Sequence, residues 1–378
     1  MSAEVRAARL SEYPLVRDLI AASFTASGTQ DEADIWDYLV ENDSALRPEG
    51  VRLAVVDGRP VACTIALPRR VRGRTGWLPG AVITLVCCHP DFRLQGHGGS
   101  TVRDAMAWVT AQGGAVSILY GVPRFYPRFG FAPVLPRLET TLPAEAVSDR
   151  AGRLDAFDAL VPLDPTPAGL ATVGRLFDET LARYPLAVAR EQQLWQWRFR
   201  NARPRGILVL RGGDGYAVAT PETKSETLIV YEAAADGVAA ARHLLSGLAG
   251  EARGAGLARI RLLEPAGHLM TRIALACGAE QVYRPAASGM AFVNSWPLVL
   301  PDGYGTAPEG LLHGGRLVLR CPHAAKVQLA LGYRSIDELL LVPECEIADD
   351  TPGGGGAERL HRDFPRLSPR WHEAPYWW

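Results

Sequence analysis

The chain has 378 residues, 48% of them hydrophobic, and its 40 Lys and Arg balance 41 Asp and Glu, a composition typical of two or three globular domains. A net charge of −1 gives no basic footprint for nucleic acid, and no apolar run approaches the ~20 residues of a membrane helix. The N-terminal segment lacks the basic stretch and apolar core of a secretory signal, so we expect a cytoplasmic protein. Six scattered cysteines, without a CxxC pair or a histidine at metal spacing, predict neither disulfides nor a bound metal.

The first third of the chain alternates strand and helix patterns. Asp57-Gly58 separates two β-rich runs and is a strong hairpin signal. The continuous run AVITLVCC is typical of a strand that is buried on both faces. In chain order we expect a strand at 4–8, helices at 11–22 and 34–41, strands at 51–56, 60–67 and 81–88, a helix from Gly98 to Gly113-Gly114, a strand at 116–120, a short helix or turn at 123–129, and strands over 131–141.

The middle of the chain repeats this order, although the two halves share little sequence. We expect helices at 166–182 and 190–199, a hairpin of 206–211 with 216–219, a strand at 227–233, a helix at 237–250, a strand at 259–264, a helix at 268–277, and strands near Val282 and Met290. The tail predicts a strand at 317–320 and helices at 324–331, 335–341 and 357–362. The predicted fold class is α/β with mixed sheets, divided into 1–145, 146–295 and a small α/β region at 296–378.

The segment LVCCHPDFRLQGHGGS, residues 85–100, carries the clearest chemical signal. A buried strand leads through a glycine-rich turn directly into a helix. Unpaired amides and the dipole at a helix N-terminus favour an anion such as phosphate, although a glycine-rich turn is also an ordinary helix cap. A P-loop would need GK[ST] after the glycines, and a dinucleotide fingerprint would open the first helix of the domain. Neither pattern is present.

The pattern Arg93-x-x-Gly96-x-Gly98, followed by FYPRFGF at 125–131, resembles the GNAT acetyltransferase superfamily. The resemblance covers the first ~140 residues in element order, and it implies an acetyl-CoA or another short acyl-CoA as co-substrate, without a metal. It implies that two neighbouring strands splay beyond Cys88 and Tyr120, and that the exposed strand edge pairs with the pantetheine arm. The implied CoA-binding residues are Val86, Cys87 and Cys88 on the strand, Arg93, Leu94, Gln95, Gly96, His97, Gly98 and Gly99 on the loop, and Gly121 and Val122 after the next strand.

Tyr126 matches the tyrosine that, in this superfamily, commonly protonates the departing CoA thiolate. The alternative is that Tyr126 belongs to an aromatic core with Phe125, Phe129 and Phe131, and Tyr120 is a second candidate donor. A backbone N–H at Cys87 or Cys88 would meet the oxyanion. A Cys–His nucleophile with His89 is disfavoured, because strand neighbours point to opposite faces and no orienting acid is evident.

The second region lacks the phosphate loop at the corresponding place. Its strand at 227–233 runs into the next helix without an Arg-x-x-Gly-x-Gly pattern, and Arg253-Gly254-Ala255-Gly256 falls at the end of that helix, as a C-terminal cap would. We therefore expect a second, degenerate GNAT-like fold and a single active site in each chain.

Tandem units with a small third region resemble the enhanced-intracellular-survival (Eis) family of acetyltransferases. The resemblance rests on LWQWRF at 194–199, LGYRS at 331–335 and DFPRLSPRWHEAPYWW at the end. That family uses its terminal carboxylate as the base, which implies this role for Trp378, although the tail is short for the family's sterol-carrier-like domain. The alternative is that the terminal aromatic residues only dock the chain end.

An acidic run surrounds Trp36, and Trp36 matches an aromatic residue of the acceptor pocket in Eis-like enzymes. The candidate acceptor residues are Trp36, Asp34 and Asp37, and the alternative is an ordinary solvated helix face. The predicted function is acyl transfer from CoA to a primary amine of a small molecule, such as an aminoglycoside or amino sugar, in a ternary complex. The alternatives are a non-catalytic acyl-CoA sensor and aminoacyl transfer from a charged tRNA. Whether the chain forms a homo-oligomer is left open.

Overall fold

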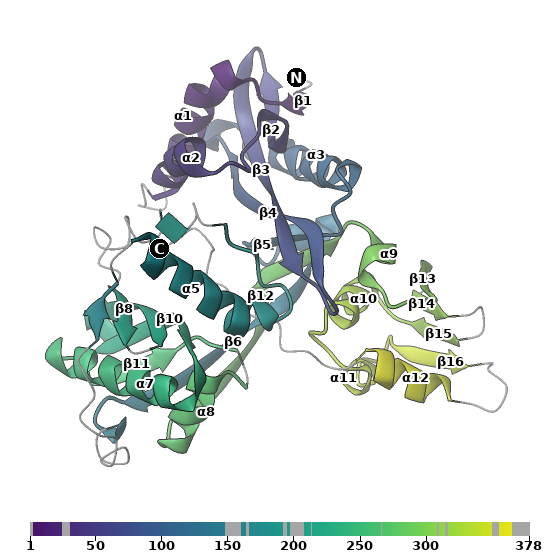
Figure 1. Ribbon diagram of the computed structural model, residues 1–378. Coiled ribbons are helices and arrows are strands. Elements are labelled where there is room, and N and C mark those ends of the chain that lie inside the picture. The colour runs from purple at the N-terminus through teal and green to yellow at the C-terminus, as the bar shows by residue number, and fades with distance from the viewer. Residues whose placement is uncertain are drawn as a thin grey trace. The chain divides into compact units, whose positions relative to one another are not determined.

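The structure is a computed structural model that describes residues 3–24, 31–147, 160–163, 166–191, 195–196, 208–212, 214–265, 267–307, 310–313, 317–349 and 355–364 (Figure 1). Contacts group the chain into two compact units: Met1–Val134 with Ala287–Leu367, and Leu135–Ala286. The chain passes from one unit to the other within two long strands, β6 (Ala132–Pro143) and β12 (Glu280–Val293). The predicted mixed α/β class is confirmed, while the expected three-region division stays a prediction.

The first unit is built on a mixed sheet in the order β1-β2-β3-β4-β5-β12. All neighbours are antiparallel except β4 and β5, which are parallel. Helices α1 and α2 lie on one side of these strands and α3 on the other (Figure 1). The elements are β1 (Glu4–Ala7), α1 (Tyr13–Phe24), α2 (Asp31–Asn42), β2 (Val51–Val56), β3 (Arg59–Arg72), β4 (Trp77–Cys88), α3 (His97–Ala111), β5 (Val116–Tyr120) and the 3-10 turn η5 (Tyr126–Phe129), with shorter 3-10 turns at Leu10–Glu12, Pro48–Gly50 and Pro90–Phe92.

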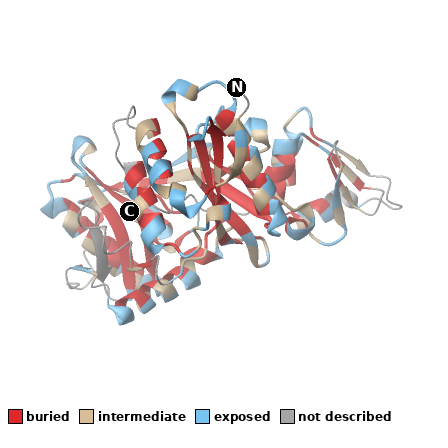
Figure 2. Cartoon of the chain, turned by 90° about the horizontal axis from the view of Figure 1, so that it is seen from above, coloured by how far each residue is buried: buried red, intermediate tan, exposed pale blue. Residues whose placement is uncertain are grey.

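The sheet strands and the inner helix faces form the core of this unit, as the burial map shows (Figure 2). In α3 the buried residues Val102, Ala105, Met106 and Val109 recur at helical spacing and pack on the sheet with Tyr126. β3 and β4 are longer than predicted, because their hairpin continues to the Arg72 and Trp77 pair, through a Pro- and Arg-rich segment that carries no alternating pattern.

The tail forms a second, four-stranded antiparallel sheet in the first unit, in the order β13-β14-β15-β16. The sequence predicted only one of these strands, because the others are short and flanked by turns. Helix α10 contacts the segment that follows the η5 turn. The ring of His323 lies 3.1 Å from the carbonyl oxygen of Gly130, and Gln328 donates to that of Pro133, at the start of β6, at 3.0 Å. The elements are α9 (Trp296–Val299), β13 (Tyr304–Ala307), β14 (Gly310–His313), β15 (Leu317–Arg320), α10 (His323–Ala330), α11 (Ile336–Leu340), β16 (Glu346–Asp349) and α12 (Gly356–Asp363).

The second unit repeats the plan with strands in the order β6-β11-β10-β9-β8-β7. Helix α5 packs on β9 and β10, and α7 packs on β8 to β11. The closing strands predicted near Val282 and Met290 are one continuous strand, β12, and most of the predicted helix at 190–199 lies outside the described residues. The elements are β7 (Val161–Pro162), α5 (Pro167–Thr180), β8 (Leu208–Gly212), β9 (Gly215–Glu222), β10 (Thr227–Ala235), α7 (Gly237–Gly254), β11 (Arg259–Leu262) and α8 (Leu269–Ala276), with 3-10 turns at Leu181–Arg183 and Thr223–Ser225. Among the described helices, none has the length and apolar character needed to cross a bilayer.

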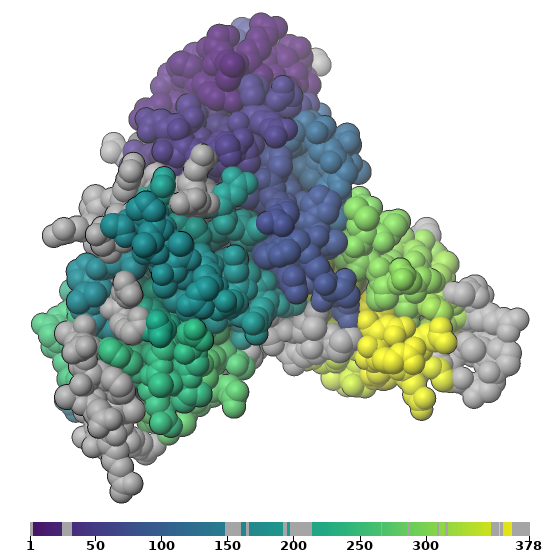
Figure 3. All heavy atoms as spheres, in the orientation of Figure 1, coloured from purple at the N-terminus to yellow at the C-terminus, as the bar shows by residue number. Residues whose placement is uncertain are grey.

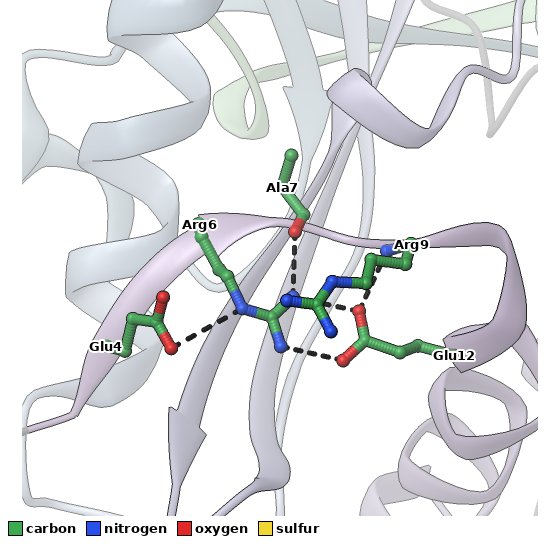
Figure 4. A network of polar contacts seen from close by, with 5 residues as sticks. All are labelled: Glu4, Arg6, Ala7, Arg9 and Glu12. Carbon is green, nitrogen blue, oxygen red and sulfur yellow. Dashed lines mark hydrogen bonds and ion pairs between the residues drawn. The ribbon is translucent and has the colours of Figure 1, made fainter.

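Charged side chains join β1 to the segment that opens α1 (Figure 4). The guanidinium of Arg6 donates to both carboxylate oxygens of Glu12, at 2.8 and 2.7 Å, and to the carbonyl of Ala7 at 2.9 Å. The backbone N–H of Arg9 donates to the same carboxylate at 2.8 Å. These bonds lower the pKa of Glu12 from its ordinary 4.5 to about 2, and the bond from Arg6 has the largest effect.

We predict that Glu12→Gln lowers the free energy of unfolding by about 1 kcal/mol at pH 7, a modest figure because water screens this surface pair. Since the pKa of Glu12 is depressed in the folded state, its contribution is complete above pH 4.5 and is lost as the pH falls towards 2. Denaturant unfolding at several pH values measures both effects. The matched control is Glu4→Gln, because Glu4 is largely exposed and lies 3.5 Å from Arg6; an equal loss in both variants would contradict the assignment.

Candidate active site

β4 carries a bulge immediately before its end. It pairs with β3 through Cys63 and Cys87 and through Ile65 and Thr84, so two residues, Leu85 and Val86, face one residue of β3. Leu85 has a φ of +46°, a left-handed conformation that is uncommon for a bulky residue. The bulge turns the last residues of β4 away from the regular ladder.

The same strand separates from β5 near the bulge. The parallel pairing of β4 with β5 ends at Val82 and Ile118, earlier than the predicted divergence beyond Cys88 and Tyr120. Beyond Val82, no strand of the described part of the chain pairs with the edge of β4 that faces β5. Backbone groups of β4 there are available to a ligand, because the usual partner strand has moved away.

The glycine-rich loop closes the end of the separated strands. Gly96 caps α3 with a φ of +90°, and Leu94, with a φ of +62°, projects fully into solvent. The first helical bond of α3 runs from the N–H of Ser100 to the carbonyl of Gly96, so the amides of His97, Gly98 and Gly99 have no partner within the helix. The Gly98 N–H bonds to the sulfur of Cys88. The remaining amides and the helix dipole favour a negatively charged group at this position.

Side-chain bonds attach this loop to the sheet. Thr101 in α3 lies 2.8 Å from the hydroxyl of Thr64 on β3, and its own hydroxyl donates to the carbonyl of Gly98 at 3.0 Å. Arg93 donates to the carbonyl of Ser23 at 2.7 Å and to that of Cys88 at 3.3 Å. The loop is therefore fixed to α1, β3 and β4 before any ligand binds.

A cavity of about 690 Å³ lies between the end of β4, the loop and the η5 turn. It includes most of the predicted CoA-binding residues together with Tyr126, while Gln95 and Gly121 do not line it. The sequence did not single out Arg103, Arg124 and Arg128 as binding residues. The lining residues are Val86, Cys87, Cys88, Phe92, Arg93, Leu94, Gly96, His97, Gly98, Gly99, Arg103, Val122, Arg124, Phe125, Tyr126, Arg128 and Phe129.

Tyr126 belongs both to the cavity wall and to the aromatic core. Its ring meets Phe125 edge-on at 4.9 Å and Phe131 at 5.9 Å, and only 7% of the residue is exposed. Burial, and after it the neighbouring Cys87, raises the pKa of the Tyr126 phenol well above its usual range. A phenol that stays protonated at neutral pH is able to donate a proton or a hydrogen bond.

Gly121 lies directly against the Tyr126 ring. A Cβ at this position would lie 2.2 Å from Cε2 of Tyr126. The N–H of Gly121 already donates to the carbonyl of Ser288 on β12 at 3.0 Å, so this N–H is committed to the sheet. Gly121 thus positions Tyr126.

Cys88, in the cavity wall, has a pKa above its usual range. Burial is the first cause that raises the pKa of Cys88, and Cys87 adds to it. Cys63, opposite Cys87, has a raised pKa, chiefly through its hydrogen bond with Cys87. His89 lies 3.3 Å from Arg59 and accepts from the N–H of Asp91 at 3.4 Å. These contacts do not form a Cys–His nucleophile.

The candidate acceptor residues lie outside the cavity lining. Trp36 is 2% exposed, and its ring meets that of Tyr13 edge-on at 5.0 Å. This contact joins α2 to α1, and the two helices form one packed purple surface in Figure 3. Both carboxylate oxygens of Asp37 accept from Arg17 at 2.8 Å, and Asp34 is exposed. Trp378 lies outside the described residues.

The second unit has the same bulge at the corresponding strand. β10 pairs with β9 through Val230 and Ala219 and then through Glu232 and Val218, so Tyr231 is the extra residue. Pairing with β11 ends at Val230 and Leu262. Beyond it, the N–H of Ala233 donates to the buried carboxylate of Glu264.

Other side chains fill the surroundings of β10. Glu232 accepts two bonds from Arg190, each at 2.7 Å, and one from the hydroxyl of Tyr216 at 2.6 Å. The guanidinium of Arg190 lies over Phe177 and Trp195, 4.2 and 4.7 Å from their ring centres. The predicted cap after α7 is confirmed: the helix ends at Gly254, and Gly256 has a φ of +70°.

The comparisons agree with this geometry. A model of the acetyltransferase (GNAT) domain matches residues 4–134. Among solved structures, a probable N-acyltransferase from Enterococcus faecalis V583 is 15% identical with a TM-score of 0.71 over 98% of both chains. A GCN5-related N-acetyltransferase from Anabaena variabilis is 14% identical with a TM-score of 0.72 over 97% of this chain and 98% of that one. A search of curated proteins finds no significant match.

Residues 4–134 therefore match the acetyltransferase (GNAT) domain family, and the whole chain shares the fold of solved structures described as N-acyltransferases and N-acetyltransferases. Eis1 from Mycobacterium abscessus shares the fold of the whole chain, with 15% identity and a TM-score of 0.70 over 98% of this chain and 99% of that one. The tandem, Eis-like architecture expected from the sequence is thereby confirmed.

We predict that Gly121→Ala lowers the free energy of unfolding by about 1–3 kcal/mol, because the new methyl group overlaps the Tyr126 ring and forces repacking. Chemical denaturation measures this loss. Gly76→Ala is the matched control, since nothing lies within 4 Å of a Cβ at Gly76. Equal stability of the two variants would show that Gly121 does not constrain the tyrosine.

Proposed function

We propose that the chain transfers an acetyl or other short acyl group from CoA to the primary amine of a small molecule. The observation that carries this proposal is one cavity that brings together a separated strand edge, the N-terminus of α3 and a buried neutral tyrosine. The strand edge and the N-terminus of α3 supply backbone hydrogen-bond partners for a long ligand that contains amides and phosphates. The tyrosine supplies a proton.

The residues present fit an acyl-CoA in extended form. Amides of His97 and Gly99 would hold the pyrophosphate, and the open edge of β4 at Val86 to Cys88 would pair with the pantetheine amides. Val122, exposed at the cavity mouth, would contact the arm's apolar surface. Gln95 would act indirectly, by supporting the loop, and Gly121 would act by positioning Tyr126.

The proposed reaction is a direct attack of the amine on the thioester carbonyl. The C–N bond forms, the C–S bond breaks, and the thiolate takes a proton from the Tyr126 hydroxyl. The N–H of Cys87 or Cys88 would stabilise the oxyanion. The raised pKa of Cys88 disfavours a thiolate there, and so favours this path over an acyl intermediate on Cys88.

The acceptor is proposed to be cationic, in the manner of an aminoglycoside or amino sugar. Asp34 and Asp37 on α2 would attract the amine, and Trp36 would contribute by anchoring α2 against Tyr13. The Trp378 carboxylate or an ordered water would take the proton of the amine.

Deleting Trp377 and Trp378 should lower turnover in a stably folded protein, and unchanged turnover would remove the terminal carboxylate as the base.

We predict that Tyr126→Phe lowers kcat by about 10²- to 10⁴-fold, the contribution of a positioned general acid, with little change in KM for acetyl-CoA. The ring packing is kept and only the hydroxyl is removed. A thiol-release assay over a panel of amines, including aminoglycosides, measures the effect. The matched variant is Tyr120→Phe, which tests the second candidate donor, a residue outside the described cavity lining. Release of CoA at the wild-type rate by Tyr126→Phe would contradict the proposed role. No release from the wild-type protein with any amine would favour an acyl-CoA sensor, and insensitivity to CoA analogues would favour tRNA-dependent transfer.

A further inference from the structure

The rim of the cavity has a strongly biased charge. Among the described residues, its lining contains Arg93, Arg103, Arg124 and Arg128 and no carboxylate, although acids and bases are balanced over the whole chain. In the described part of the chain, no carboxylate pairs with Arg103, Arg124 or Arg128. An exposed arginine is ordinarily a solvated surface group, but several around one cavity without counter-charges favour a polyanionic ligand.

Two of these arginines are held by aromatic rings. The guanidinium of Arg103, on α3, lies 5.4 Å from the ring centre of Phe129. That of Arg128 lies 4.8 Å from the ring centre of Phe125, and its Nε donates to the carbonyl of Phe125 at 2.9 Å. Because the two rings contact each other at 5.1 Å, one aromatic pair orients both cations.

The arginines differ in what they are free to do. Arg93 already donates to two backbone carbonyls, so it serves mainly to brace the loop. The Nη2 of Arg103 lies beside the phosphate loop, 3.8 Å from a Cβ placed at Gly99. Arg103 and Arg128 are therefore the cations best placed for a phosphate next to the one held by the loop amides.

The phosphates of CoA differ in their charge and in the groups that bind them best. Each phosphorus of the pyrophosphate carries one ester and one anhydride linkage and a single negative charge, which the amides of α3 can satisfy. The 3′-phosphate of the ribose is a monoester that carries about two negative charges at pH 7 and is best met by guanidinium groups. A CoA without this phosphate would leave the paired arginines without a ligand.

We propose that Arg103 and Arg128 bind the 3′-phosphate and make the chain selective for CoA over 3′-dephospho-CoA. This selectivity rests on the proposed function, because it assumes that the cavity binds CoA. Arg124, which lies over no aromatic ring of the described residues, contributes only long-range attraction.

The test is a calorimetric titration of the full chain with CoA and with 3′-dephospho-CoA. We expect the wild-type protein to bind CoA at least about 10-fold more tightly, the factor that 1.4 kcal/mol of charge-assisted bonding supplies. Arg103→Gln and Arg128→Gln should each weaken CoA binding by a similar factor and leave 3′-dephospho-CoA binding within about 2-fold. Circular dichroism spectra confirm that each variant is folded.

Arg320→Gln is the matched control, since it removes the same charge from an exposed residue of the small sheet outside the cavity. Equal binding of the two ligands by the wild-type protein, or equal weakening of both by the arginine variants, would overturn the proposal, and so would the absence of CoA binding. Selective CoA binding without thiol release from acetyl-CoA would instead uphold this proposal and overturn acyl transfer.

Discussion

The bulge near the end of β4 is the constraint on which the first unit depends. By placing two residues, Leu85 and Val86, opposite one residue of β3, it redirects β4 close to where pairing with β5 ends. The separation exposes a strand edge, and the following loop turns back so that α3 begins beside it. Strand edge, helix amides and Tyr126 then surround one cavity. The chemistry follows from backbone geometry more than from a set of charged catalytic residues.

In the second unit, side chains occupy the edge of the strand that corresponds to β4. β10 has its own bulge at Tyr231 and also separates from its parallel neighbour. There the N–H of Ala233 is bonded to Glu264, and the Arg190–Glu232 pair lies buried beside it. We infer that these internal carboxylates stand where a pantetheine amide would have to bind. A GNAT-like fold is thus retained without the open strand edge of the first unit.

The sequence revealed the parts of the site that local chemistry dictates. A buried strand, a glycine-rich turn and a helix lie in series at 81–111, and Tyr126 of FYPRFGF lines the cavity, while its catalytic role stays a prediction. The bulge left no sequence signal, because a leucine carries the left-handed turn. Of the rim arginines, Arg103, Arg124 and Arg128 were missed, because α3 and the segment around the η5 turn contribute them separately. Trp36 matched a pocket residue in pattern, yet the amphipathic face of α2 buries it.

The most direct measurement is the number of CoA molecules bound by each full-length chain, obtained by calorimetric titration at a protein concentration well above the dissociation constant. The account predicts one, because the strand edge is open in the first unit and bonded to Glu264 in the second. A stoichiometry of two would contradict the closure of the second unit. The absence of binding would contradict the account of the cavity itself.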